Sequence, residues 1–462
     1  MRSVVYPIAM VASLSAGARA ETTPALARLL TQPGELASWL RDRDPVIDAQ
    51  GARIEAAQAA ARQTRVIPNP QLNFGVSDIV IGKTNAGSGG AGSDDPSLSL
   101  GKTLIFTAGV EQLVELGKRG PRQNAADLRV REAAETATGA LGTRLGDATQ
   151  SLGKLAYVAA RRSVVAANLD DARRLMALEK VRLEHSDLSA LEFARIELDT
   201  RAIALQLARA ESDVAGSVAA CSAALYLECS PAGLDDPAVL DAGAPLPRAE
   251  TETQAQAQGQ AQAQAQAQIE AAIDARPARV ASKLETQALG WDATLAHNRR
   301  IPDPTLGVGY TLDNLTIAGD QHQSLMFTIG IPLPIFDRGN HDEAAARASA
   351  RATAAEAVAE VRQATGQVEA LLAQRAMLES AIATLTSDAV PKSAQIVERT
   401  RRAFDLGQAP LADLLLAERA HRDLLLELLD TRFDLFNVRA QLRRELGLDD
   451  QAARDAVRRN PS

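Results

Sequence analysis

Residues 298–313 read NRRIPDPTLGVGYTLD and, after a polar turn, residues 323–339 read QSLMFTIGIPLPIFDRG. Apolar residues alternate with small or polar ones on both sides of the turn, as Leu306, Val308 and Phe327 show. Alternation with a period of two over about eight residues predicts two β-strands with one apolar face. A half-buried hairpin of a soluble protein would alternate in this way, and so would the strands of a membrane barrel with a wet lumen.

A second copy of the pattern lies at 65–120 and favours the second interpretation. It begins RVIPNPQLNFGVSD, crosses a loop rich in Gly, Ser and Asp, and resumes as PSLSLGKTLIF. The tetrapeptide Ile67–Pro70 matches Ile301–Pro304 in character at every position. The apolar rows of this copy are Leu72, Phe74 and Val76, then Leu98, Leu100, Leu104 and Phe106. A repeat spacing of roughly 230 residues predicts two similar halves, each a helix, a hairpin and a very long helix pair.

The composition agrees with long helices. Aromatic residues make up 3% of the 462 residues, and Ala and Leu dominate the apolar ones, which favours close packing of helices over large globular cores. The net charge of −8 argues against a nucleic-acid partner.

The N-terminus predicts export. Met1–Ser3 precedes the apolar run Val4–Leu14, and small residues then lead to Ala18–Ala20. This is the layout of a secretory signal peptide with cleavage before Glu21, and the alternative is an ordinary buried helix. No later segment offers the 18 or so apolar residues of a membrane helix. Export combined with barrel-type hairpins points to the outer membrane of a Gram-negative cell.

Each half continues into a long run of helix-forming residues. No proline occurs from 122 to 230, and a helix from Pro121 to about Arg182 would be on the order of 90 Å long, as in a coiled coil or a tube. Residues 347–389 and 411–446 repeat this pattern.

Both runs are interrupted at comparable points, 183–192 and 404–413. Gly407 is a natural helix terminator, and Pro410 suits the first turn of the next helix. Ser186 stands where Gly407 stands. We therefore expect two helix-hairpin turns at the end far from the membrane.

Residues 251–268 are an almost pure Ala–Gln repeat, which fits either a solvated helix or a disordered linker. Residues 231–247 are expected to be loop. The expected organisation is a signal peptide (1–20), a first repeat (21–230), a linker (231–268), a second repeat (269–450) and a C-terminal tail (451–462).

The strand-to-helix junctions read ELGKR at 115–119 and IPLPIFDRGN at 331–340. With the paired hairpins and turns, they make the chain resemble the TolC-like outer-membrane efflux family from about residue 45 to 447. The junctions resemble in particular the branch that serves heavy-metal RND pumps of the cobalt–zinc–cadmium type. The resemblance implies a mainly α protein with a small β part, and a homotrimer in which four strands per chain build one twelve-stranded barrel continued by a periplasmic α-helical barrel.

Such proteins are passive exit ducts of tripartite efflux systems, which receive solute from an RND pump through a periplasmic adaptor. Here the implied solute is heavy-metal cations. The alternatives are the duct of a drug-efflux or type I protein-secretion system, or an exported helical spacer. Four strands cannot close a barrel around a lumen, and an open edge is not tolerated in lipid, so membrane-embedded hairpins require an oligomer.

In such a barrel, one row of side chains faces lipid and the other faces the lumen. The residues expected to face lipid are Leu72, Phe74, Leu100, Leu306, Val308 and Phe327. Those expected to face the lumen are Asn73, Thr305 and Thr328.

By position, the resemblance carries adaptor docking over to two turns, which are Ser186, Asp187 and Leu188 in the first half and Leu406, Gly407 and Gln408 in the second. Ser186 departs from the Gly usual in the family. The alternative is that Gly407 merely ends a helix.

The resemblance also carries a periplasmic gate over to Glu192 and Asp413, six residues past Ser186 and Gly407. Threefold symmetry would turn each carboxylate into a ring, in which neighbours raise one another's pKa and attract cations. Leu416 stands where a second acidic ring is sometimes found. The alternative is that both acids only favour the start of a helix through its dipole.

Motifs for catalysis, cofactors and metals are missing. The five histidines are scattered without metal-ligand spacing, and there is no phosphate-binding loop or nucleophile elbow, so we expect neither an enzyme nor a cofactor. Cys221 and Cys229 would stand about 12 Å apart in one continuous helix, too far for a disulfide. If the helix ended near Leu227, Pro231 would let the chain fold back and a disulfide could form, so the sequence leaves this open.

Overall fold

The computed structural model describes residues 25–77, 79, 104–186, 188–246, 260–314 and 321–459. The expected signal peptide, Leu100 and Asp187 lie outside the described residues. None of the described helices is long and apolar enough to cross a membrane.

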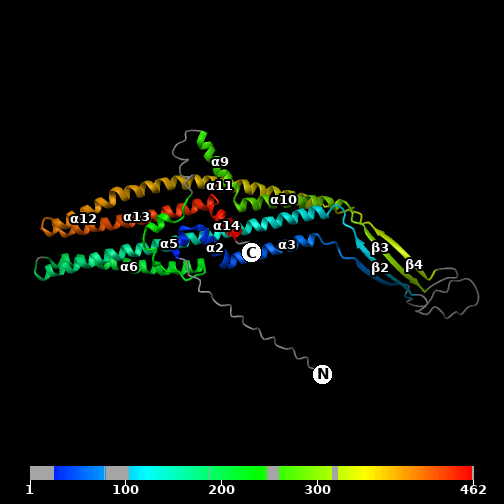
Figure 1. Cartoon of the computed structure of the whole chain (residues 1–462), viewed down its shortest axis with the longest axis horizontal. Coiled ribbons are helices and arrows are strands. Elements are labelled where there is room, and N and C mark those ends of the chain that lie inside the picture. The colour runs from blue at the N-terminus through cyan, green and yellow to red at the C-terminus, as the bar shows by residue number, and fades with distance from the viewer. Residues whose placement is uncertain are drawn as a thin grey trace, which may run out of the picture. The chain divides into compact units, whose positions relative to one another are not determined.

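The described chain is mostly helical with one small sheet, as expected (Figure 1). The helices are α1 (Leu26–Thr31), α2 (Pro33–Arg43), α3 (Pro45–Thr64), α5 (Arg119–Glu184), α6 (Ala190–Leu225), α7 (Ala238–Ala242), α9 (Gln260–Asp274), α10 (Pro277–His297), α11 (Asn340–Thr384), α12 (Val390–Asp405), α13 (Leu411–Glu445) and α14 (Leu448–Arg459). The strands are β1 (Gln71–Ser77), β2 (Ile105–Leu113), β3 (Thr305–Asp313) and β4 (Gln323–Gly330). A 3-10 turn (Asn298–Arg300) follows α10, and a π-helical segment (Leu385–Ala389) joins α11 to α12.

The four strands form one antiparallel sheet in the order β1-β2-β3-β4. Residues directly opposite one another place their side chains on the same face of a sheet. Across the four strands, Val110 is opposite both Leu72 and Val308, and Val308 is opposite Phe327. These four residues therefore lie on one face. This apolar face consists of Leu72, Phe74, Val76, Phe106, Ala108, Val110, Gln112, Leu306, Val308, Tyr310, Leu312, Gln323, Leu325, Phe327 and Ile329. The opposite face is mainly small or polar and consists of Gln71, Asn73, Gly75, Ser77, Ile105, Thr107, Gly109, Glu111, Leu113, Thr305, Gly307, Gly309, Thr311, Asp313, Ser324, Met326, Thr328 and Gly330.

Strands β3 and β4 lie where the sequence predicted the second hairpin, but the described part of β2 lies farther along the chain than the pattern at 98–106 predicted. Its residues after Phe106 are TAGVEQL, in which small and polar residues hide the alternation. They form a strand because β2 is paired on both sides, with β1 and β3. Leu104 precedes the strand, whereas Phe106 lies on the apolar face.

The chain divides into two units, and α2, α5, α11 and α13 contribute to both. The first unit contains Met1–Leu36, Thr149–Pro245 and Ile382–Phe436. The second contains Ala37–Ala148, Leu246–Ala381 and Asn437–Ser462, and therefore the sheet.

Each unit has its own packed core. In the first unit, the ring of Phe436 fills the space beside Gly153, where an added Cβ would lie 2.0 Å from a ring carbon. Glycine at 153 is therefore required by close packing. In the second unit, Val368 packs with Val438 and Leu442 in an apolar cluster.

The structure describes parts of the two segments that the sequence placed between the expected repeats. Residues 231–247 were expected to be loop, which is wrong at α7, whose start is held by a hydrogen bond from Ala238 N to Asp236 Oδ1 (2.9 Å). The described part of the Ala–Gln tract, from Gln260, is helical in α9.

Cys221 and Cys229 form a disulfide with their Cα atoms 6.0 Å apart. Helix α6 ends at Leu225, and Tyr226 adopts a left-handed conformation (φ 53°) that turns the chain back. The structure thus answers the question that the sequence left open.

Candidate functional site

The two breaks in the long helices are turns with the same backbone conformation. Gly407 follows α12 with φ 67°, and Gln408 N donates to Ala403 O at 2.8 Å, which closes a Schellman-type helix end. Ser186 follows α5 with φ 63°, and its N–H donates to Leu183 O at 3.0 Å. Ser186 therefore stands in the first turn as Gly407 stands in the second.

One apolar cluster of the first unit holds both turns. Leu188 from the first turn is buried together with Phe404 and Leu411, which flank the second. Ser186, Leu406, Gly407 and Gln408 are exposed, and Leu406 is exposed to 72%. The exposed residues form the surface of the paired turns, and Leu188 is a packing residue beneath it.

The two acids expected at the gate differ in their contacts. Glu192 forms a capping box at the start of α6: its carboxylate accepts hydrogen bonds from Ser189 Oγ (2.7 Å) and Ser189 N (3.1 Å), and its own N–H donates to Ser189 Oγ (3.2 Å). These bonds from the Ser189 side chain and backbone lower the pKa of Glu192. Asp413 lies in the first turn of α13 and is exposed, and its carboxylate has no hydrogen bond or ion pair within the described chain. Of the two acids, Asp413 is therefore the one whose carboxylate makes no polar contact within the described chain.

An ion-pair cluster in the first unit was not predicted from the sequence. Asp199 of α6 is buried and accepts from Arg419 (2.8 Å) and Arg422 (3.1 Å) of α13. The two arginines lie 220 and 223 positions after Asp199 in the sequence, so no local pattern could predict these ion pairs. They fasten α6 to α13.

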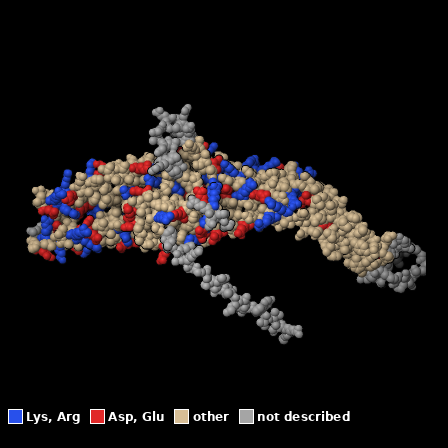
Figure 2. Space-filling model, in the orientation of Figure 1, with Lys and Arg blue, Asp and Glu red and all other residues tan. Residues whose placement is uncertain are grey.

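The apolar face of the sheet is uncharged and exposed. Phe74 and Phe327 are each exposed to 76%, and Leu72, Leu325 and Ile329 are also exposed. Figure 2 shows Lys, Arg, Asp and Glu over the helices, whereas the visible surface of the sheet is almost free of them. A contiguous apolar surface of this extent requires contact with lipid or with another chain. Leu306 and Val308, also expected to face lipid, belong to the same face.

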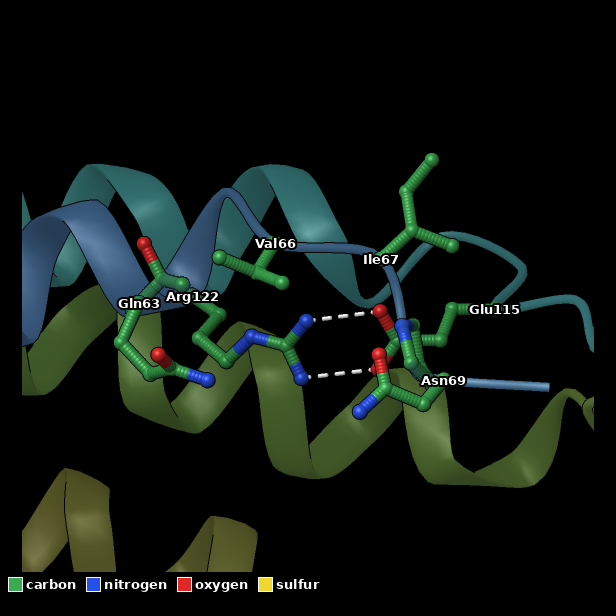
Figure 3. Close-up of a pocket in the computed structure, with 8 residues that line it drawn as sticks. Gln63, Val66, Ile67, Asn69, Glu115 and Arg122 are labelled. Carbon is green, nitrogen blue, oxygen red and sulfur yellow. Dashed lines mark hydrogen bonds and ion pairs between the residues drawn. The ribbon is translucent and has the colours of Figure 1, made fainter. Parts of the chain in front are cut away.

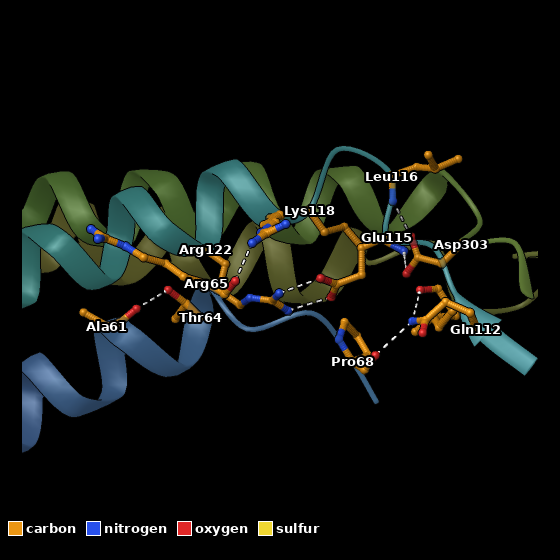
Figure 4. A network of polar contacts seen from close by, with 12 residues as sticks. Ala61, Thr64, Arg65, Pro68, Gln112, Glu115, Leu116, Lys118, Arg122 and Asp303 are labelled. Atoms are coloured by element: carbon orange, nitrogen blue, oxygen red, sulfur yellow. Dashed lines mark hydrogen bonds and ion pairs between the residues drawn. The ribbon is translucent and has the colours of Figure 1, made fainter. Parts of the chain in front are cut away.

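The first junction motif, ELGKR, joins the two hairpins (Figure 4). Asp303 accepts from Leu116 N at 2.9 Å and from Lys118 Nζ at 2.6 Å. Gly117, with φ 70°, directs its carbonyl to Asn298 Nδ2 at 2.6 Å. Since Lys118 and Asp303 are separated by 185 residues, the sequence alone could not pair them.

Beside this network lies an open groove of about 330 Å³ (Figure 3). Its lining residues are Gln63, Thr64, Val66, Ile67, Pro68, Asn69, Glu115 and Arg122. Glu115 and Arg122 form a two-bond ion pair of 2.8 and 2.6 Å at its edge. Of the other lining residues, the exposed ones are the apolar Val66 and Ile67 and the polar, uncharged Gln63 and Asn69.

The second junction motif ends in Gly339, whose φ of 73° favours glycine and whose added Cβ would lie 2.2 Å from Ala296 O. Just beyond it, Glu343 forms ion pairs with Arg347 (2.7 Å) and Arg300 (3.3 Å). Both junction motifs therefore have a geometric role at the ends of strands.

No group of three or more His, Cys, Asp or Glu is close enough to hold a metal ion among the residues that the structure covers. His297 Nδ1 lies 3.1 Å from Glu343, and His421 Nδ1 lies 2.8 Å from Ser393 Oγ. Among the described residues, neither histidine lies in a group that could hold a metal ion.

The fold is that of an outer-membrane channel. The solved structure of CusC, described as forming a transmembrane channel, covers 92% of this chain and 95% of its own, with a TM-score of 0.69 and 16% identity. That of VceC from Vibrio cholerae covers 92% and 99%, with a TM-score of 0.67 and 17% identity.

Residues 268–448 match the family described as outer membrane efflux protein. The cobalt-zinc-cadmium resistance protein CzcC of Cupriavidus metallidurans is 23% identical over 380 residues, which are 81% of this chain and 79% of CzcC. The resemblance to the outer-membrane efflux family and its heavy-metal branch is confirmed, and with it the outer-membrane location that it implied. This family and this fold are those of channel proteins.

Proposed function

We propose that this protein is the exit duct of a tripartite efflux system. Three chains would contribute four strands each to a twelve-stranded barrel, continued by an α-helical barrel in the periplasm. Heavy-metal cations, handed over by an RND pump and a periplasmic adaptor, would pass through it passively. The proposed organisation is the one expected from the sequence, with a signal peptide (1–20), two repeats (21–230 and 269–450), a linker and a tail.

The observation that carries this proposal is the sheet, which has one exposed, uncharged apolar face and an opposite face made mainly of Thr, Gly and other small or polar residues, with Ile105, Leu113 and Met326 as its large apolar members. Lipid would cover the first face, including Leu72, Phe74, Leu306, Val308 and Phe327, and water in the lumen would wet the second. The outer edges of β1 and β4 have no partner strand within the described sheet. Because lipid cannot satisfy such edges, several copies must close the barrel.

The paired turns support the docking of an adaptor. Ser186, Leu406, Gly407 and Gln408 form one exposed surface on a shared core. Leu406 offers an apolar contact, and a Cβ added at Gly407 would meet no atom within 4 Å. In this proposal Asp413, together with Glu192, forms the cation-attracting ring of the gate.

The nature of the solute rests on the relative, whose name assigns it resistance to cobalt, zinc and cadmium. Carboxylate rings at the gate favour cations in the same way. The test is a deletion strain grown with zinc, cobalt or cadmium and complemented with the wild-type gene. Restored tolerance and lower cell-associated metal support the proposal. Restored drug tolerance or protein secretion, without any effect on metals, would assign the duct to the alternative systems.

A docking variant sharpens this test. Gly407→Trp should abolish export while leaving the oligomer assembled. Gly407→Asn is the matched control, because Asn also adopts the left-handed conformation and adds little bulk. Export that survives Gly407→Trp would remove the docking assignment.

A further inference from the structure

Within the chain, the segment that follows β2 is seated on the segment that precedes β3. Val114 N donates to Pro304 O at 2.9 Å, and thus extends the ladder beyond the last strand residue. Leu116 N and Lys118 Nζ then bind the Asp303 carboxylate. The end of the first hairpin is in this way joined to the start of the second.

The segment before β1 repeats the one before β3. Ile67, Pro68 and Asn69 correspond to Ile301, Pro302 and Asp303, and each tetrapeptide ends in a proline directly before its strand. By the same correspondence Thr64 stands where Asn298 stands. In the first copy, these residues line the open groove of Figure 3, and Ile67 is exposed to 61%.

The segment after β4 is apolar and uncovered. Leu333, Ile335 and Phe336 are exposed to 72%, 60% and 100%. The hydrogen bonds that this segment makes in the described chain are local, such as Ile335 N to Leu333 O (2.9 Å). Three large apolar side chains exposed within four residues indicate a surface that another chain covers.

The prolines of this segment end the hydrogen bonding of β4 to β3 and leave the outer edge of β4 able to pair. In the β3–β4 ladder, Asp313 N donates to His322 O, so even-numbered residues of β4 direct their N–H groups to β3. Pro332 and Pro334 continue the even-numbered series and have no N–H, which ends the pairing with β3. The N–H of Leu333 is left on the outer edge.

We propose that residues 331–336 of one chain are seated in the groove at 63–69 of a second copy, with β4 paired to its β1. This inference rests on the proposed function, since it needs an oligomeric barrel. In this arrangement β4 takes the place that β2 has within the chain, and β1 of the second copy takes the place of β3. The β2–β3 register, in which Glu111 is opposite Gly307, then places Gly330 opposite Asn73 of the partner subunit. Leu333 N then donates to Pro70 O of the partner subunit, as Val114 N does to Pro304 O.

The joint between copies differs in chemistry from the internal one. Inside the chain, Asp303 meets the ammonium of Lys118. Between copies, the neutral Asn69 and the apolar Ile67 receive Ile335 and Phe336. The ionic contact thus lies within one chain, where it is permanent. The apolar contact lies between chains, where it forms on assembly.

The register is tested by cross-linking Asn73→Cys with Gly330→Cys in one chain, whose native cysteines are already bonded to each other. The control pair, Asn73→Cys with Thr328→Cys, lies on the same face but is shifted by two residues. A disulfide needs Cα atoms within roughly 7 Å, so we expect about tenfold more cross-linked trimer from the first pair. An added Cβ at Gly330 would lie 3.2 Å from Thr305 Oγ1, and the pair Gln71→Cys with Pro332→Cys therefore tests the same register without that contact.

The seat is tested by Phe336→Ser, which should lower the temperature at which the trimer dissociates in detergent, whereas Phe336→Leu should keep it. The proposed contact between copies would be overturned if the shifted pair cross-linked preferentially. It would also be overturned if the Phe336→Ser trimer dissociated at the same temperature as the wild type. A conducting trimer in native mass spectrometry and bilayer recordings would then still support the duct. The absence of any oligomer would overturn both.

Discussion

Ser186 and Gly407 adopt the same left-handed backbone conformation, with φ of 63° and 67°, in two turns whose flanking residues share one apolar cluster. This conformation costs a non-glycine residue about 1 kcal/mol. Ser186→Gly should therefore raise the free energy of unfolding by about 0.5–1 kcal/mol, measured by denaturant unfolding of the detergent-solubilised protein. In the control, Gly216 lies inside α6 with open space around it, so Gly216→Ala should stabilise instead of destabilise. A destabilised Ser186→Gly protein would contradict the equivalence of the turns.

The gate assignment predicts an electrical effect for Asp413. Asp413→Ala should reduce cation selectivity or raise the resting conductance of the channel in a planar bilayer, because a ring of carboxylates attracts cations. Glu192→Ala should in addition destabilise the start of α6 by about 1 kcal/mol, since it removes the capping box with Ser189. If the double variant and the wild type carry the same current with the same cation block, both acids act only at helix starts.

The two faces of the sheet predict opposite tolerance of charge. Val308→Arg or Phe327→Arg should cost about 2–4 kcal/mol if these residues lie near the middle of the membrane, and Thr328→Arg far less because water in the lumen can solvate it. The measurement is the yield of folded trimer in lipid vesicles. Phe327 and Thr328 are neighbours on opposite faces, and each therefore controls for the other. Equal yields would show that the hairpins are not in a membrane.

The Lys118–Asp303 ion pair should contribute measurably to stability. Both side chains are largely buried, and the pair is 2.6 Å long. A double-mutant cycle with Lys118→Ala and Asp303→Ala should give a coupling free energy of about 1–3 kcal/mol. The matched control is the exposed pair Arg65–Asp127, which should give less than about 1 kcal/mol. Similar values for the two pairs would mean that Lys118 does not fasten the hairpins together.

Asp450 predicts a dependence of stability on pH. Burial raises the pKa of its carboxyl from 3.8 to about 6, against the opposing charge of Arg276. A raised pKa in the folded state means that the group contributes stability at low pH and that this contribution is lost as the pH rises through about 6. Asp450→Asn should thus be more stable than wild type by about 2–3 kcal/mol at pH 8, with the difference vanishing near pH 4. Thermal unfolding across this range measures it, and a difference between variant and wild type that does not change with pH would contradict it.

Much of the architecture could be predicted because it follows from local pattern. Alternation at Thr305–Asp313 gave the third strand, and Gly407 with Pro410 gave the second turn. Features that depend on distant partners could not be predicted. Strand β2 is held by neighbours on both sides, and the contact of Lys118 with Asp303 spans 185 residues. The disulfide depended on where α6 ends, which Tyr226 decides through a left-handed conformation that its residue type does not favour.

The Cys221–Cys229 disulfide also bears on how the chain matures. The protein has two cysteines, and they are eight residues apart, so one intramolecular pairing exists and no incorrect one can trap the chain. An exported chain of this kind needs an electron acceptor for its thiols but no isomerase to correct them. Both cysteines precede the second half of the sequence, and the bond can therefore close while that half is still crossing the inner membrane.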